Sequence, residues 1–182
     1  MTESGITFTV DATQPSHQRI KVEIQIKAPF MKPKLKLSFP RWVPGSYFLR
    51  EPIQHVTALS VTNDSGQTLP FSRKDVDSIV ISNVQSIKHV TVKYELLAVD
   101  LSVRSNHFDH THLHMMPPFT WFLPTSGIET ERMNLQHSVQ FKLPKSWTVT
   151  TQLNPVGIKE NDDMKVHTYS AENRDDFLPF LP

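Results

Sequence analysis

The chain has 182 residues, of which 38% are hydrophobic, and 19 basic against 18 acidic side chains give a formal net charge of +1. This length suits one domain with a sizeable core, and the balanced charge without a basic stripe argues against nucleic acid as a partner. The absence of cysteine excludes disulfides and thiolate chemistry. The sequence contains neither a signal peptide nor a run of about 20 apolar residues. We therefore expect no membrane partner and, by default, a cytoplasmic location, with a periplasmic or secreted one left open.

Apolar residues alternate with polar ones along most of the chain, which predicts half-buried β-strands. Ile6, Phe8 and Val10 share the first such face, and the four residues Ile20, Val22, Ile24 and Ile26 share the second. The same period of two recurs at 35–39, 90–96, 139–143, 147–149 and 164–168, and the Asn-Asp-Ser-Gly sequence at 63–66 is typical of a hairpin turn. The pattern predicts an all-β fold, either a β-sandwich or a large twisted antiparallel sheet, in a single domain over residues 1–182.

One stretch, PRWVPGSYFLREPIQHV at 40–56, interrupts the strands with three prolines. The Pro-Gly pair at 44–45 predicts a type II turn, Ser46 is placed to cap one helical turn after it, and Pro52 would end that turn. The simpler interpretation is a rigid corner whose aromatic residues lie in the core. The alternative is that Trp42, Tyr47 and Arg50 line a surface that faces a ligand or another domain.

A second block, VTVKYELLAVDLSVRSNHFD, occupies residues 90–109. The two blocks together resemble the N-terminal domain of the glycyl aminopeptidase-like metallopeptidases. The resemblance implies a fold similar to the N-terminal domain of aminopeptidase N-like enzymes. It also implies that the parent protein is a thermolysin-like zinc aminopeptidase, whose catalytic zinc domain and frequent C-terminal PDZ domain are absent from these 182 residues.

The zinc motif of such enzymes, His-Glu-x-x-His, does not occur in the sequence, because no histidine is followed by glutamate. We therefore expect this chain not to be an enzyme by itself and to need no cofactor, with zinc in the absent catalytic domain. The resemblance implies a non-catalytic domain that braces the catalytic domain of the same parent protein and walls one side of the substrate cleft. The peptide substrate would then be only an indirect partner.

Three further residues are candidates for the cleft or the domain interface. Arg104, in the second block, is either ion-paired with Asp100 or Asp109 or directed at a substrate. Phe119 and Trp121 belong to the stiff apolar segment PPFTWF, which forms either core or a docking surface. The full set of candidates is Trp42, Tyr47, Arg50, Arg104, Phe119 and Trp121.

Four histidines gather at positions 107, 110, 112 and 114. If residues 110–114 form a strand, His110, His112 and His114 share one face at steps of about 6.5 Å and can bind a metal ion, with Asp109 or a histidine from elsewhere as a further ligand. The interpretation that we favour is a polar outer face without metal.

Two other functions compete with the peptidase domain. One is a free-standing β-sandwich module that binds a peptide or carbohydrate by stacking on Trp42, Tyr47 and Trp121. The other is a small metalloprotein built on the histidine face.

Overall fold

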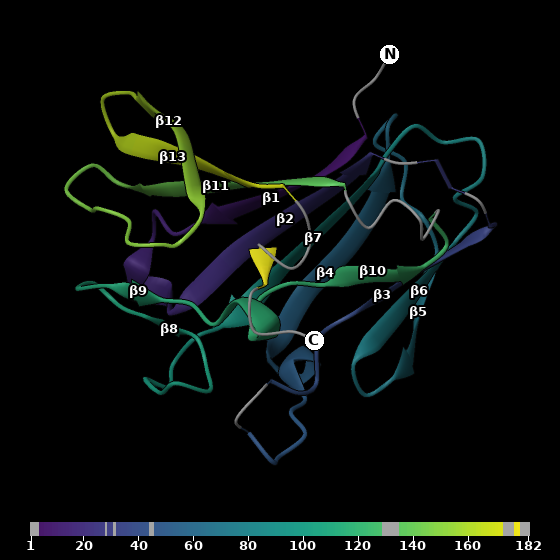
Figure 1. Ribbon diagram of the computed structural model, residues 1–182, viewed down its shortest axis with the longest axis horizontal. Coiled ribbons are helices and arrows are strands. Elements are labelled where there is room, and N and C mark those ends of the chain that lie inside the picture. Colours follow the sequence, from purple (N-terminus) through teal and green to yellow (C-terminus); the bar gives the residue numbers. More distant parts are fainter. Residues whose placement is uncertain are drawn as a thin grey trace.

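The fold was analysed in a computed structural model, which describes residues 4–27, 29–30, 32–43, 46–128, 135–172 and 177–178. Strands dominate the described residues, and three short 3-10 helices connect some of them (Figure 1). The strands are β1 (Gly5–Asp11), β2 (Arg19–Lys27), β3 (Lys34–Ser38), β4 (Val56–Asn63), β5 (Phe71–Asp75), β6 (Ser78–Ser82), β7 (Val90–Leu97), β8 (His107–Phe108), β9 (Leu113–His114), β10 (Leu123–Ser126), β11 (Gln136–Pro144), β12 (Asn154–Glu160) and β13 (Met164–Ala171). The 3-10 helices are η1 (Pro15–His17), η2 (Pro52–His55) and η3 (Pro117–Phe119). Within this described part of the chain, no helix has the length and apolar character needed to cross a membrane.

The main element is a seven-stranded sheet in the order β12-β13-β11-β1-β2-β7-β4. Its described pairs are antiparallel except one, because β1 runs parallel to β11 with Gly5 opposite Gln136. The all-β prediction is therefore confirmed, and the sheet is mixed rather than wholly antiparallel. The parallel pair joins the first strand of the chain to a strand from its last third. These two strands, β1 and β11, lie next to each other near the centre of the sheet.

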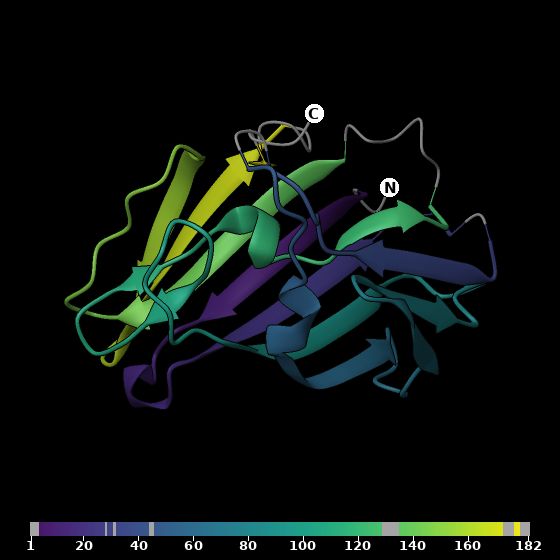
Figure 2. The ribbon, with the colours of Figure 1, turned by 90° about the horizontal axis from the view of Figure 1, so that it is seen from below.

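Two smaller sheets accompany the large one. A four-stranded sheet has the order β10-β3-β6-β5, and β8 pairs with β9 in a two-stranded hairpin. Figure 1 shows the β8–β9 hairpin at the opposite end of the molecule from β5 and β6. In Figure 2 the strands of the large sheet lie side by side in a twisted layer, which is the usual consequence of the right-handed strand twist.

The core is built from the alternating residues that the sequence predicts. The predicted faces of β1, β2, β3 and β7 are almost completely buried and belong to one hydrophobic cluster. Two expectations are wrong. Residues 147–149 form no strand, and in β13 the deeply buried residues are His167 and Ala171 rather than the 164, 166 and 168 face.

Tyr94 ties the large sheet to the segment that follows η3. Its hydroxyl donates a 2.6 Å hydrogen bond to the carbonyl of Thr120, and both residues are buried. Burial raises the pKa of this hydroxyl far above its ordinary value, so it stays a neutral donor. The ring also makes an edge-on contact with Phe122, at 5.3 Å between ring centroids.

The substitution Tyr94→Phe should lower the free energy of unfolding by about 1–2 kcal/mol, because it leaves the buried Thr120 carbonyl without this donor. Urea denaturation measures the change. Tyr169→Phe is the matched control, since it removes a hydroxyl from a half-buried ring that keeps its contact with Phe141, and it should change stability by less than about 0.5 kcal/mol. Equal effects of the two substitutions would contradict the assigned role of the Tyr94 hydroxyl.

Candidate functional site

The first motif block forms a tight, irregular corner. The Ser46 N–H donates to the Val43 carbonyl at 3.1 Å, which closes a four-residue turn; the predicted type of that turn depends on residues 44 and 45, which lie outside the described residues. The Arg50 N–H donates to the Arg41 carbonyl at 2.8 Å and holds the two ends of the corner together. The predicted helical turn after Ser46 is wrong. Helix η2 instead starts at Pro52, where proline has the φ angle of a first helical position and needs no donor.

Large apolar side chains on both blocks point into solvent. Tyr47 and Phe48 of the first block are 99% and 67% exposed, and Val99, Leu101 and Val103 of the second block are 42%, 64% and 74% exposed. We call these five residues the apolar patch. Exposed apolar groups gathered on two loops are typical of an interaction or ligand-binding surface.

Two adjacent pockets show that the blocks meet in space. One, of about 400 Å³, lies between Tyr47 and Phe48 on one side and Val103 on the other. The second, of about 530 Å³, contains Val99 and Leu101. Arg50, Arg104 and Phe119 line both pockets. Four of the six residues predicted as candidates, Tyr47, Arg50, Arg104 and Phe119, therefore line pockets at the junction of the two blocks.

Arg50 lies partly buried at this junction. Its guanidinium carbon is 5.5 Å from the centroid of the Phe48 ring, a cation–π contact. Its Nε and Nη2 atoms are buried and have no hydrogen-bond partner among the described residues. Buried donors of a charged group are costly when unpaired, and the described residues supply no acceptor for these two atoms.

Asn106 fixes the segment that carries Phe119 to the junction of the two blocks. Its buried amide accepts a 2.8 Å hydrogen bond from the Met116 N–H and donates at 3.3 Å to the Phe119 carbonyl. The Thr120 hydroxyl lies 3.1 Å from the same amide oxygen. These contacts fix η3, which carries Phe119 to the pockets.

The remaining two candidates, Trp42 and Trp121, line neither of these pockets. Trp42 is 41% exposed on the first block, close in sequence to the apolar patch. Trp121 is 2% exposed and contacts Phe8 at 5.0 Å between ring centroids, so it lies in the core. Arg104 is exposed and has no ion-pair partner among the described residues, and the expected pairing with Asp100 or Asp109 is not found there.

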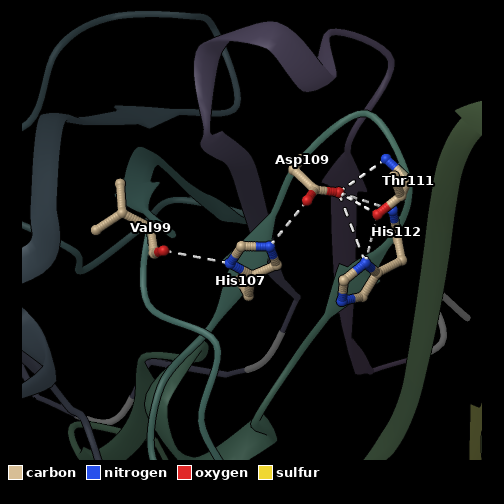
Figure 3. A network of polar contacts seen from close by, with 5 residues as sticks. All are labelled: Val99, His107, Asp109, Thr111 and His112. Carbon is tan, nitrogen blue, oxygen red and sulfur yellow. Dashed lines mark hydrogen bonds and ion pairs between the residues drawn. The ribbon is translucent and has the colours of Figure 1, made fainter.

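The histidine segment is not the strand that the metal hypothesis required. Only Leu113–His114 is a strand, and residues 109–112 form a turn in which the Asp109 N–H donates to the His112 carbonyl at 3.1 Å. His110, His112 and His114 therefore do not share a strand face. The structure instead brings His107, Asp109 and His112 together (Figure 3).

Asp109 is the centre of this cluster. Its Oδ1 accepts from the Thr111 hydroxyl at 2.6 Å, the Thr111 N–H at 2.7 Å and the His112 N–H at 3.0 Å. These donors, the Thr111 hydroxyl first, hold the pKa of the carboxyl well below its ordinary value. The second oxygen, Oδ2, lies 3.2 Å from His107 Nε2. The cluster is therefore a preorganised carboxylate flanked by two imidazoles.

Sequence reasoning missed several residues of both sites. Phe48, Leu101 and Val103 belong to the quoted blocks but follow no strand alternation, and that departure is the signal that could have marked them. For the histidines, the sequence analysis named His107 and Asp109 but missed that they gather with His112, and the signal for this is the Asp-x-Thr-His order, in which an aspartate caps the following backbone N–H groups.

The sequence profile of the peptidase M61 N-terminal domain family matches residues 7–179. The chain belongs to this family. No curated protein sequence matches the chain.

Solved structures with a similar fold include an aminopeptidase N family protein and an M1 zinc metallopeptidase. An aminopeptidase N family protein from Idiomarina loihiensis superposes with a TM-score of 0.78 at 22% identity, over 95% of this chain and 28% of that chain. An M1 zinc metallopeptidase from Deinococcus radiodurans gives a TM-score of 0.51 at 11% identity, over 92% of this chain and 38% of that chain. The chain thus has the fold of a domain in these proteins and spans well under half of their length.

Asn106→Ala should destabilise the chain by about 2–4 kcal/mol, because it leaves the Met116 N–H and the Phe119 carbonyl without their partner. Asn154→Ala is the control: Asn154 is exposed, and its removal should cost less than about 0.5 kcal/mol. Urea unfolding gives the free energies, and the amide NMR signals of 116–120 report the local effect. An unchanged spectrum there would contradict the role of Asn106.

Proposed function

We propose that the chain is the non-catalytic N-terminal domain of a zinc-dependent, glycyl aminopeptidase-like metallopeptidase. It braces the catalytic domain of the same parent protein and forms one wall of the substrate cleft. The observation that carries this proposal is the junction of the two motif blocks, where the apolar patch and Arg50 line the same pockets and two buried donors of Arg50 have no acceptor among the described residues. The family match and the aminopeptidase fold support it.

The apolar patch supplies the driving force for docking. Covering a valine, leucine or phenylalanine side chain contributes about 1.5–3 kcal/mol each, and interface residues near the centre of a patch carry most of the binding energy. Phe48 and Val103 stand on opposite sides of one pocket. A side chain of the catalytic domain inserted between them would contact both blocks at once.

Arg50 supplies the specificity. The proposed partner places a carboxylate or backbone carbonyl against the part of the Arg50 guanidinium that lines the two pockets. Charge-assisted hydrogen bonds of this kind are about twice as strong as neutral ones. A surface that offered only apolar groups would bury Arg50 further without pairing it.

In this proposal, the zinc ion of the peptidase reaction is bound by the catalytic domain and not by this chain. The 182 residues contain no His-Glu-x-x-His, the motif that provides two ligands and the general base in such enzymes. A PDZ domain, like the catalytic domain, would lie outside these residues. A free-standing stacking module is not favoured, because Trp121, one of its three proposed stacking groups, is buried against Phe8.

The isolated chain should not hydrolyse glycyl or alanyl anilides, with or without added zinc, because it lacks the peptidase motif. A chromogenic anilide assay of the purified chain tests this, with the parent protein as positive control. Hydrolysis that disappears in the double variant His110→Ala/His112→Ala would overturn the proposed function.

The double variant Phe48→Ser/Val103→Ser should weaken the binding of the chain to the catalytic domain of its parent protein by at least about tenfold, since two apolar anchors are lost. Its own unfolding free energy should change by less than about 0.5 kcal/mol per site, because both side chains are exposed. Calorimetric titration of the separately expressed domains measures the binding.

The matched control is Val156→Ser/Ile158→Ser. Both residues are exposed apolar side chains, and they lie on β12, an edge strand of the large sheet, outside both pockets. This variant should bind the catalytic domain as the unaltered chain does. Equal losses in the two double variants would exclude the apolar patch as the specific interface.

A further inference from the structure

We propose that His107, Asp109 and His112 bind one divalent transition-metal ion, zinc in the first place, at the β8–β9 hairpin. One ring nitrogen of each histidine and one carboxylate oxygen of Asp109 lie within 4.8 Å of one another. Two imidazoles and a carboxylate are a donor set that suits zinc, copper and nickel. This proposal is independent of the peptidase assignment.

His107 is oriented as a metal ligand would be. Its Nδ1 lies 3.2 Å from the carbonyl oxygen of Val99, which can only accept, so Nδ1 carries the proton (Figure 3). In the neutral ring Nε2 then has a lone pair, and that lone pair is 3.2 Å from Asp109 Oδ2. Two acceptors at this distance repel unless a proton or a cation lies between them. Metal-bound histidines commonly donate their other N–H to a backbone carbonyl in this way.

Asp109 presents one oxygen to the same point. The three hydrogen bonds from Thr111 and His112 all end on Oδ1. They fix the plane of the carboxylate and leave the Oδ2 lone pairs directed at His107. Ligating carboxylates in metal sites are held by such outer hydrogen bonds.

His112 completes the set from the end of the turn that joins β8 to β9. Its Nδ1 lies 2.8 Å from the Thr111 hydroxyl oxygen, whose single proton is used at 2.6 Å toward Asp109. The His112 Nδ1–H therefore donates to that hydroxyl, and Nε2 keeps a lone pair. The ring centroids of His107 and His112 are 5.0 Å apart.

The spacing fits a tetrahedral ion with only a local adjustment. Zinc–nitrogen and zinc–oxygen bonds of about 2.0–2.1 Å place neighbouring ligands about 3.3 Å apart, and the His107 to Asp109 distance of 3.2 Å has this value already. The His112 side chain is 45% exposed and can turn to close the remaining edges. Its ring also lines a groove of about 620 Å³, so the fourth position is open to water. Because His107 also contacts the Val99 carbonyl, the ion would link the β8–β9 hairpin to the loop that carries Leu101 and Val103.

Calorimetric titration of ZnCl₂ into the chain, purified without a histidine tag and treated with EDTA, tests the site. We expect one Zn²⁺ per chain and a metal-dependent rise in melting temperature. His107→Gln and His112→Gln should each weaken binding by at least about tenfold, since even outer-shell changes cost 10–100-fold in affinity. The half-exposed position of His112 keeps that variant folded even if His107→Gln unfolds.

His110→Gln is the matched control, because His110 lies in the same turn but outside the cluster, and it should bind zinc as the unaltered chain does. Co²⁺ absorption and the imidazole NMR signals of His107 and His112 report the ligands directly. An absence of stoichiometric binding would mean that only a proton joins His107 and Asp109, and would overturn the proposal. Equal loss in the His110→Gln variant would identify unspecific chelation and overturn it as well.

Discussion

The buried polar contacts around η3 are the constraint on which the exposed surface depends. Asn106 binds the backbone on both sides of this short helix, and Tyr94 binds the carbonyl of Thr120 from the sheet. Both residues belong to the second motif block, one in its strand and one in its tail. The block thus forms hydrogen bonds with the backbone at and next to η3 through two side chains. These bonds fix the position of Phe119, which lines both pockets. Since the donors and acceptors are buried, displacing η3 would leave several of them unpaired.

The strands could be predicted because each is buried on one face. In β1, β2 and β7 the period of two coincides with burial. The pairing between β1 and β11 could not be predicted, because it joins segments more than a hundred residues apart and no local sequence pattern encodes a parallel neighbour. The β13 face was mispredicted because a histidine and an alanine are buried there, whereas Met164 and Val166 are only partly covered. Hydrophobicity alone ranks those residues in the wrong order.

The candidate site was harder to predict than the fold because it lies in loops. Tyr47 and Phe48 are aromatic, and the default for such residues is burial, yet both face solvent. The histidine cluster depends on the turn that Asp109 makes with the two following residues. This turn reverses the chain, so His107 on β8 approaches His112 at the end of the turn, whereas strand geometry would have aligned 110, 112 and 114. Side-chain capping of backbone donors competes here with the extended conformation.

The combination of the apolar patch with Arg50 restricts what can cover this surface. Burying Phe48 and Val103 is favourable for any apolar partner, but the same burial removes the remaining water from the Arg50 guanidinium, whose Nε and Nη2 find no acceptor in the part of the chain that the structure describes. An uncompensated buried charge costs more than one or two apolar contacts return. A partner must therefore offer apolar side chains and an oxygen acceptor in register. Unspecific association fails the second condition, which is how an exposed apolar surface can select one domain.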